Sequence, residues 1–231
     1  VYAITTLDQD LQEKASLILR EEIEKATGMD KSVLTTVLRN LERSDFILRY
    51  SQYGNKSKGA IYRLVDFYTL FYYRFIHNFN AQDEEWWSHN FQSPSIESWQ
   101  GFSFELLCLI HLAQIKKKLG ISGIATATSS WRYIPQKKKE ENEKIEKGTQ
   151  IDMLIDRGDR IINLCEMKFS INPYRITDSY EQTLRDRINI FQEKTQTTKS
   201  LVYTFVTTFG VANGIGSSIV NSEVTMEDLF A

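Results

Sequence analysis

Ionisable residues interrupt two short apolar runs near the middle of the chain. Asp152 lies in the run Gln150-Ile-Asp-Met-Leu-Ile-Asp156, and Glu166 and Lys168 lie two residues apart in a second run. Alternate residues of a strand point to the same face, so Glu166 and Lys168 are expected to share one. A carboxylate and an ammonium beside aliphatic side chains are costly to bury unless they are paired or bind a metal. This segment is therefore a candidate site of chemistry.

Hydrolysis of a phosphodiester is the reaction that these residue types suit. A divalent cation polarises the phosphoryl oxygen and lowers the pKa of the attacking water. Mg²⁺ prefers carboxylate oxygens, which Asp152 and Glu166 would supply, with the backbone carbonyl of Met167 as a third ligand. Lys168 would orient or deprotonate the water, and Glu105, on an apolar helical segment, would reach the metal or its water. Mg²⁺, or Mn²⁺ in its place, is the expected cofactor.

The register of the two runs decides whether Asp152 belongs to this site. A two-residue loop, Arg157-Gly158, would place Asp152 opposite Asn163 and turn it away from Glu166. An odd loop that includes Asp159, or a bulge, would place Asp152 opposite Leu164, on the face of Glu166. Gly158 suits a three-residue loop with one residue in the left-handed region. We therefore predict the odd register.

A series of helices and strands after residue 98 would position these residues. Apolar spacing predicts a helix over 98–120, which Gly120 ends, and a second helix over 178–194. The predicted strands are 121–128, 131–134, 149–156, 160–169 and 200–207, and a short helix covers 226–230. The order α-β-β-β-α-β indicates an α+β or α/β fold with a mixed sheet. The charged segment 136–147 is expected to be a solvated loop, and it adjoins the site.

The first 65 residues predict a winged helix-turn-helix domain. Residues 10–44 have the spacing of three short helices, with a turn at Gly28 and the longest helix over 31–43. Strands at 46–50 and 61–64 around a polar loop would form the wing. Residues 66–97 are rich in aromatic residues and predict a linker, with a helix over 66–78. Its aromatic side chains favour an interdomain core over a ligand cage. The nuclease-like region would then cover 98–231.

Basic residues gather in the predicted winged helix. Between Lys31 and Arg63 there are seven basic residues and two acidic ones, although the whole chain of 231 residues carries a net charge of −2. Contact with DNA would therefore come from this local patch. The expected DNA-binding residues are Lys31, Ser32, Thr35, Thr36, Arg39, Arg43, Lys56 and Lys58. The alternative is a winged helix that only docks other proteins.

Composition limits the other classes of function. The apolar stretch 67–79 is interrupted and too short to span a bilayer, so no membrane partner is expected. Cys108 and Cys165 lack metal-ligand spacing and favour a reducing cytoplasm. His77, His89 and His111 have no mutual spacing suited to zinc.

The order of elements and the acidic residues resemble the PD-(D/E)xK nuclease superfamily. The match consists of Glu105 on the first helix, Asp152 on the second strand and Glu166-Met167-Lys168 on the third. In that superfamily these positions bind Mg²⁺ and cleave DNA, and the resemblance implies a supporting role for Gln182 on the following helix. Ile151 precedes the aspartate where the motif has proline. An inert nuclease fold, in which Lys168 only pairs with Glu166, is the alternative.

The whole chain resembles the C-terminal half of archaeal-type AAA-class ATPases, which also occur in bacteria. The matching segments are Tyr62–Ile76, Gly101–Glu105, Gln150–Asp156, Leu164–Ser170 and Asp228–Phe230. The resemblance implies that a P-loop ATPase domain precedes this part. No Gly-x-x-x-x-Gly-Lys-[Ser/Thr] motif occurs in the chain, so ATP is expected to bind only through that N-terminal domain. The ATPase domain and DNA are the expected partners, and the oligomeric state is left open.

Overall fold

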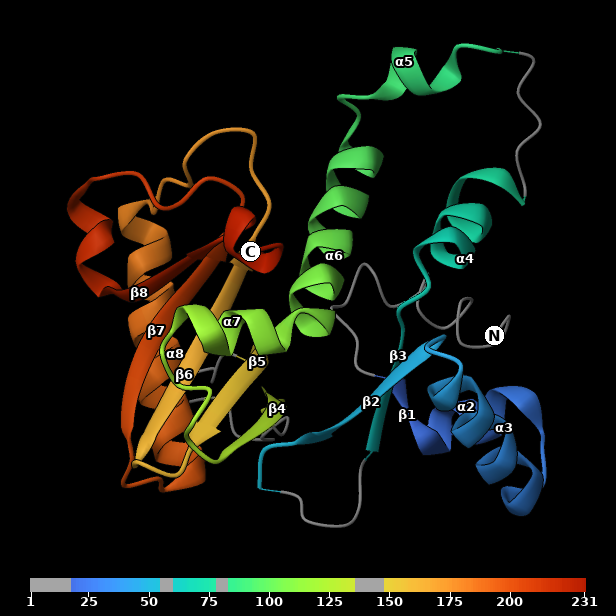
Figure 1. Ribbon diagram of the computed structural model, residues 1–231, viewed down its shortest axis with the longest axis horizontal. Coiled ribbons are helices and arrows are strands. Elements are labelled where there is room, and N and C mark those ends of the chain that lie inside the picture. Colours follow the sequence, from blue (N-terminus) through green and yellow to red (C-terminus); the bar gives the residue numbers. More distant parts are fainter. Residues whose placement is uncertain (1–17, 55–59, 78–82, 136–147) are drawn as a thin grey trace, which may run out of the picture. The chain divides into compact units, whose positions relative to one another are not determined.

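Two units divide the chain, Val1–Trp99 and Gln100–Ala231, which we call the N-terminal and the C-terminal unit. The structure is a computed structural model that describes residues 18–54, 60–77, 83–135 and 148–231 (Figure 1). Its class is α+β with a mixed sheet, as predicted. In these described ranges, no helix is long and apolar enough to cross a membrane.

The N-terminal unit begins with two helices beside a small antiparallel sheet. Its elements are β1 (Ile18–Leu19), α2 (Arg20–Thr27), α3 (Lys31–Arg43), β2 (Ile47–Gln52) and β3 (Ala60–Leu64). The strand order is β1-β3-β2. The predicted helix over 31–43 and the two predicted strands are confirmed. Residues 55–59 of the loop, with Lys56 and Lys58, lie outside the described residues.

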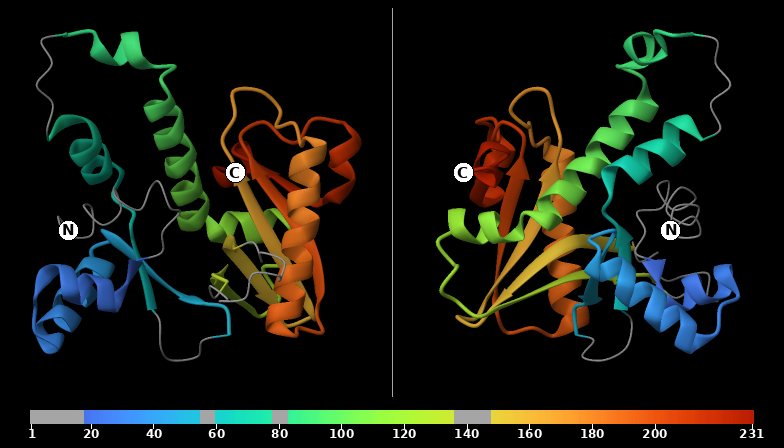
Figure 2. Two further views of the ribbon diagram at one scale, coloured as in Figure 1. Left: turned by 180° about the vertical axis from the view of Figure 1, so that it is seen from behind. Right: turned by 45° about the vertical axis from the view of Figure 1, so that its right-hand side comes forward.

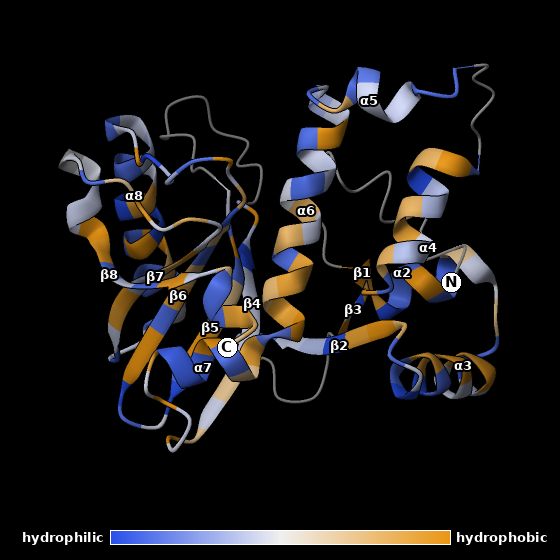
Figure 3. Cartoon of the chain, turned by 45° about the horizontal axis from the view of Figure 1, so that its top comes forward, coloured by the Kyte–Doolittle hydropathy of each residue, from blue (hydrophilic) through white to orange (hydrophobic). Residues whose placement is uncertain are grey.

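The turn between α2 and α3 follows from two residues. Gly28 has φ 62°, and its N–H donates to the Glu24 carbonyl at 2.9 Å, which ends α2. The Asp30 carboxylate accepts a hydrogen bond from the backbone N–H of Ser32 at 2.8 Å and caps α3. Apolar residues recur along α3 between hydrophilic ones (Figure 3), and Leu34 and Leu38 are buried. The helical pattern of the sequence is thus a core stripe.

The prediction that Ile18 belongs to a helix is wrong, because this residue lies in a strand. Ile18 and Leu19 pair with Tyr62 and Ile61 of β3 as strand β1. Ile18 is fully buried in this position. Pairing with a distant strand overrides the local helical spacing, because two residues carry too little periodicity to decide between helix and strand.

The aromatic segment of the N-terminal unit forms its own cluster. Helix α4 (Phe67–Phe71) continues into a π-helical turn, η1 (Tyr72–Ile76), and α5 (Trp86–Asn90) follows. The ring centroids of Phe71, Phe75, Trp87 and Trp99 lie 5.2 to 6.1 Å apart in every pair. The predicted helix over 66–78 is therefore α-helical only in its first half, and residue 78 is outside the described residues.

The helix predicted over 98–120 is two helices. Helix α6 spans Pro94–Ile110 and α7 spans Leu112–Lys118. They are separated at His111, which leaves the helical region with φ −100° and ψ 27° and contacts the Leu107 carbonyl through its ring Nδ1 at 2.9 Å. Gly120 follows α7 with φ 68°, so the predicted glycine end is confirmed.

The C-terminal unit is built on a mixed sheet in the order β4-β5-β6-β7-β8. Its strands are β4 (Thr126–Tyr133), β5 (Thr149–Arg157), β6 (Ile161–Lys168), β7 (Ser200–Thr207) and β8 (Val220–Thr225). Strands β4, β5 and β6 are antiparallel, whereas β6, β7 and β8 are parallel. Helix α8 (Asp178–Thr195) connects β6 to β7. The segment 136–147 between β4 and β5 lies outside the described residues.

Most strands of this unit agree with the sequence prediction, and three details do not. Residues 121–125 are not strand, and one strand with an irregularity between Ser129 and Trp131 replaces two short ones. Strand β8 was not predicted, because only Val224 of its six residues is fully buried and the pattern is polar. The predicted last helix is a 3₁₀ turn, η3 (Glu227–Leu229), and a second such turn, η2 (Ile215–Ile219), precedes β8.

Helices cover both faces of this sheet. In Figure 1, α7 lies in front of the strands and α8 behind them, and the reversed view of Figure 2 agrees. On the α8 face, the Tyr203 hydroxyl donates to the Leu184 carbonyl at 2.8 Å, and the Trp131 ring lies 4.9 Å from Phe191. On the other face, the ring of Phe104 of α6 packs near the ring of Phe169, with their centroids 6.1 Å apart. The sheet around β6 thus packs against helices on both faces.

Candidate functional site

The β5–β6 hairpin places Asp152 and Glu166 on one face. Asp156 pairs with Ile162, β5 ends at Arg157 and β6 begins at Ile161, so the loop 158–160 is three residues long, an odd number. The predicted odd register is therefore confirmed. Continued by one residue, it sets Asp152 opposite Glu166, whereas the partner predicted for Asp152, Leu164, pairs with Leu154. Directly opposed residues of antiparallel strands point the same way, and their Cβ atoms lie about 5 Å apart.

Glu166 is buried, and its carboxylate is bound by three side chains. Only 7% of the side chain is exposed. Its Oε2 accepts a hydrogen bond from the Tyr180 hydroxyl at 2.6 Å and lies 3.5 Å from Lys168 Nζ. Its Oε1 forms an ion pair with Arg187. Both carboxylate oxygens therefore have partners from the chain itself, which offsets the cost of burying the charge.

Helix α8 brings Tyr180 and Arg187 to this carboxylate. Thr177 caps the start of the helix, and its side chain accepts a hydrogen bond from the Tyr180 backbone N–H. Tyr180, Leu184, Arg187 and Phe191 follow each other at intervals of four, three and four residues, which places them on one stripe. Leu184 and Phe191 are buried. Sequence reasoning missed Arg187, although its spacing from Tyr180 puts a cation on a core-facing stripe.

The electrostatics of Tyr180 link two further carboxylates to the cluster. Burial is the largest cause that raises the pKa of Tyr180, followed by Tyr174, Tyr203, Asp152 and Glu105. The phenol therefore stays protonated and donates to Glu166. Lys168 Nζ lies 5.2 Å from the centroid of the Tyr180 ring. Asp152 and Glu105 are the smallest of these causes, and both act on the hydroxyl that donates to Glu166.

Glu105 approaches from a different layer than the strands. It is half-buried on α6, the helix whose Phe104 contacts Phe169. Phe169 and Met167 alternate with Lys168 and Glu166 along the chain, so they belong to the opposite side of β6. Glu105 therefore lies on a helix that packs against the side of β6 opposite to Glu166.

Three more predicted residues have defined places. Asp152 accepts a hydrogen bond from the side-chain amide of Gln150, within the same strand. Met167 is buried and pairs with Val206 in the parallel ladder. Gln182 is exposed, and its amide donates to Asp186 of its own helix at 2.9 Å. The structure thus directs Gln182 away from the Glu166 carboxylate, and Tyr180 and Arg187 are the side chains of α8 that reach it.

The donor set fits a hard divalent cation in chemical type. Mg²⁺ takes one or two carboxylates from protein and completes its shell with water and substrate. Asp152 and Glu166 are such a pair on one face. In the part of the chain that the structure describes, however, no three His, Cys, Asp or Glu side chains are grouped to hold a metal. Arg187 and Lys168 supply the positive charge at Glu166 in this arrangement.

The predicted DNA-binding residues of α3 share an exposed side of the helix. Ser32, Thr36, Arg39 and Arg43 follow each other at intervals of four, three and four residues, and all four are exposed. Four of the predicted residues have partners in the chain, since the Ser32 hydroxyl donates to Asp30 and the Thr36 hydroxyl donates to the Ser32 carbonyl. Lys31 forms an ion pair with Glu24 at 3.8 Å, and the Thr35 hydroxyl donates to the Lys31 carbonyl at 2.7 Å. The two arginines are the cations best placed on this stripe.

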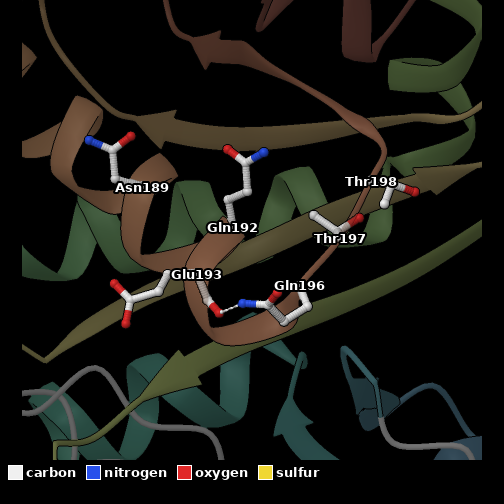
Figure 4. A pocket seen from close by; sticks show the side chains of 6 residues that line it. All are labelled: Asn189, Gln192, Glu193, Gln196, Thr197 and Thr198. Atoms are coloured by element: carbon white, nitrogen blue, oxygen red, sulfur yellow. Dashed lines mark hydrogen bonds between the residues drawn. The ribbon is translucent and has the colours of Figure 1, made fainter.

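A pocket of about 380 Å³ lies at the end of α8, apart from the predicted residues. Its lining is formed by six polar residues: Asn189, Gln192, Glu193, Gln196, Thr197 and Thr198 (Figure 4). The Gln196 amide donates to the Glu193 carbonyl at 2.6 Å. The predicted catalytic and metal-binding residues are absent from this lining, so the pocket does not contribute to the Glu166 cluster.

Histidine side chains have ordinary structural contacts. His89 Nδ1 lies 2.9 Å from an oxygen of Asp83, and His111 contacts the Leu107 carbonyl. Burial raises the pKa of the Cys165 thiol to about 12, and Cys108 is also buried, so both thiols are held in the unreactive protonated form.

Comparisons of the chain with protein-family models, with curated proteins and with solved structures gave no match.

Proposed function

We propose that the chain is a DNA-binding, magnesium-dependent nuclease-like module that hydrolyses phosphodiester bonds. The observation that carries the proposal is the shared face of Asp152 and Glu166, with Lys168 two residues farther along β6. Metal-assisted phosphodiester hydrolysis uses a carboxylate pair for the cation and an ammonium at the reacting phosphate. Here the register places all three residues on one face of the hairpin.

The residues of the cluster have distinct roles in this proposal. Asp152 and Glu166 would hold Mg²⁺ or Mn²⁺, which when bound polarises the phosphoryl oxygen and lowers the pKa of a water. Tyr180 fixes the orientation of Glu166 through its 2.6 Å hydrogen bond. Lys168, with 32% of its side chain exposed, is available to orient a water and to offset the charge that develops on the phosphoryl group.

The arrangement of elements supports a specific architecture. The order β1-α2-α3-β2-β3 with an antiparallel sheet is that of a winged helix from its first strand onward. Three antiparallel strands, a crossover helix and a parallel strand follow α6 and α7, as in restriction-endonuclease-like folds. With the resemblance in sequence, this order supports the C-terminal half of an archaeal-type AAA-class ATPase. ATP would then act only through an N-terminal domain.

Nicking of supercoiled plasmid tests the proposed activity. Wild-type protein is expected to nick DNA in Mg²⁺ or Mn²⁺ and not in chelator. Asp152→Ala and Lys168→Ala are each expected to slow nicking by about a hundredfold, because each removes a group that acts on the metal or the phosphate. Asp159→Ala is the matched control, since this exposed carboxylate pairs with Arg157 in the hairpin loop. Nicking that persists in both site variants would contradict the proposal.

Salt-dependent binding of duplex DNA tests the α3 surface separately. Replacement of Arg39 and Arg43 by glutamine is expected to weaken binding and to lower the slope of log affinity against log salt by about 1 for each arginine. Replacement of Lys116 and Lys117 of α7 removes the same charge from the other unit and is expected to leave the slope unchanged. An equal change in both double variants would assign the effect to net charge rather than to α3.

A second function is supported by the partners of Glu166. Because Tyr180, Lys168 and Arg187 together bind both oxygens of this carboxylate, the cluster is complete without a metal. In this alternative the nuclease fold is inert, and the chain is a DNA- or protein-binding assembly module of the ATPase. DNA binding that depends on Arg39 and Arg43, together with no nicking by wild-type protein, favours this alternative.

A further inference from the structure

Arg187 occupies the side of Glu166 that Tyr180 and Lys168 leave free. Its Nη1 pairs with Oε1, while Tyr180 and Lys168 lie at Oε2. The exposed fractions of the Arg187 and Glu166 side chains are 16% and 7%. An ion pair with this little exposure is weakly screened by water and salt. The guanidinium is therefore the positive group at Oε1 of Glu166, while the Lys168 ammonium lies at Oε2.

A divalent cation at Glu166 requires one of these partners to leave. Tyr180 is neutral and its hydrogen bond to Oε2 is compatible with a cation at Oε1. Arg187 is positive and stands at Oε1, so it and a divalent cation repel each other and compete for the same oxygen. Arg187 is therefore the partner that a metal displaces.

Other contacts of Arg187 lower the free-energy cost of breaking its ion pair with Glu166. Its Nε is buried and has no hydrogen-bond partner among the described residues. A buried donor without a partner costs free energy, so the guanidinium is incompletely satisfied in the ion pair. Arg187 also lowers the pKa of Tyr203, against the larger effect of burial that raises it to about 12, so its charge lies near a second side chain of the α8 face.

We propose that Arg187 and a divalent cation are alternative partners of Glu166. Arg187 is a positioning residue that holds the carboxylate when the metal is absent and gives up Oε1 when the metal binds. This inference rests on the proposed function, because it assumes that Asp152 and Glu166 bind a cation. It adds that the affinity for the metal is set by competition with a side chain of α8.

Thermal unfolding with and without Mn²⁺ tests the competition in the full chain. The variant is Arg187→Gln, and the matched control is Arg185→Gln, which lies on the same helix, is 52% exposed and pairs only locally with Glu181. Without metal, Arg187→Gln is expected to have a lower Tm, because it leaves a buried carboxylate less compensated. With Mn²⁺, its Tm is expected to rise more than that of wild type, in keeping with metal affinity about tenfold higher.

The outcomes separate this inference from the proposed function. A rise in Tm that is equal in wild type and Arg187→Gln, and lost in Asp152→Ala, overturns the competition but leaves the metal site standing. No rise in any variant overturns both. Weaker Mn²⁺ binding by Arg187→Gln than by wild type also overturns the competition. The Arg185→Gln control is expected to match wild type in both conditions.

A variant that does not fold in metal-free buffer still gives an answer. Arg187→Gln that refolds only when Mn²⁺ is added supports the competition, since the cation then replaces the missing charge. If it folds in neither condition, Arg187→Lys is used, because its compact ammonium keeps the charge but not the planar fork. Tighter Mn²⁺ binding by Arg187→Lys than by wild type supports the inference, and equal or weaker binding overturns it.

Discussion

A buried carboxylate is tolerated in a fold when neighbouring groups neutralise it, and Glu166 is bound from two directions. Lys168 comes from its own strand, and Tyr180 and Arg187 come from the crossover helix α8. The strand partner is fixed by alternation along β6, whereas the helix partners depend on how α8 packs. The charge of Glu166 is therefore balanced by one partner from its own strand and by two partners from a helix that packs against it.

Asp228 is a second carboxylate whose surroundings favour the charged form. Its two oxygens accept hydrogen bonds from Lys118 Nζ at 2.8 Å and from the Thr225 N–H at 2.8 Å. Burial works to raise the pKa of Asp228, but the bonds from Lys118 and Thr225 outweigh it, and the pKa falls below its ordinary value of 3.8. The lowered pKa means that this stabilisation is present above pH 3.8 and is lost as the pH falls through the pKa of the folded state.

Substitution of Asp228 by asparagine tests this sign. We expect Asp228→Asn to lower the free energy of unfolding by about 1 kcal/mol at pH 7, because the bonds lose their charge assistance. The difference from wild type is expected to shrink as the pH is lowered below 3.8. Urea unfolding at both pH values measures it. Glu227→Gln, an exposed neighbour, is the control, and a difference that stays constant with pH would contradict the assignment.

The candidate site shows what sequence can and cannot predict for single residues. Period-two alternation correctly put Glu166 and Lys168 on one face, and turn chemistry gave the odd register that brings Asp152 to it. The exact partner of Asp152 was missed by two residues, because the three-residue loop lies at 158–160, one residue later than predicted. Arg187 was missed because its role depends on the packing of α8 against β6, which no local pattern specifies.

At the scale of elements, long periodic segments were predicted well and short or polar ones were not. Helices α3 and α8 have apolar stripes over three or more turns, and their bounds differ from the prediction by one residue or less. Strand β8 is polar, and β1 has two residues, so neither has a pattern strong enough to detect. The break between α6 and α7 falls at His111, which is neither glycine nor proline, so the sequence carries no signal for it.

Two glycines allow the effect of substitution by alanine on stability to be compared between the end and the interior of a helix. Gly28 has φ 62° at the end of α2, and a Cβ added there would meet no atom within 4 Å. Gly28→Ala is therefore expected to cost about 1 kcal/mol, from backbone strain alone. Gly101 lies inside α6, also with open space around it, and Gly101→Ala is expected to stabilise by about 0.5 kcal/mol.

Circular dichroism during urea unfolding measures both glycine variants. Because Gly28 belongs to the N-terminal unit and Gly101 to the C-terminal unit, separate transitions would assign each effect to its unit. Destabilisation by both substitutions to the same extent would contradict the role of the left-handed conformation at Gly28.

At the scale of the whole molecule, positive charge gathers on one segment, while the chain as a whole is slightly acidic. The chain carries a net charge of −2, so the proposed attraction to DNA would depend on the exposed stripe of α3 and not on the overall field. The proposed chemistry belongs to the C-terminal unit, and the proposed DNA surface belongs to the N-terminal unit. Variants of one surface are therefore expected to change binding or cleavage without the other, which makes the two halves of the proposal separable.

Trp131 gives the C-terminal unit an intrinsic optical label. The chain has four tryptophans, and Trp86, Trp87 and Trp99 all lie in the N-terminal unit. Trp131 is buried, and its ring meets Phe191 edge-on near the end of α8. With the other three replaced by phenylalanine, a red shift in emission would signal exposure of Trp131 to water as α8 detaches. The packing of the helix that carries Tyr180 and Arg187 can thus be followed by the fluorescence of Trp131.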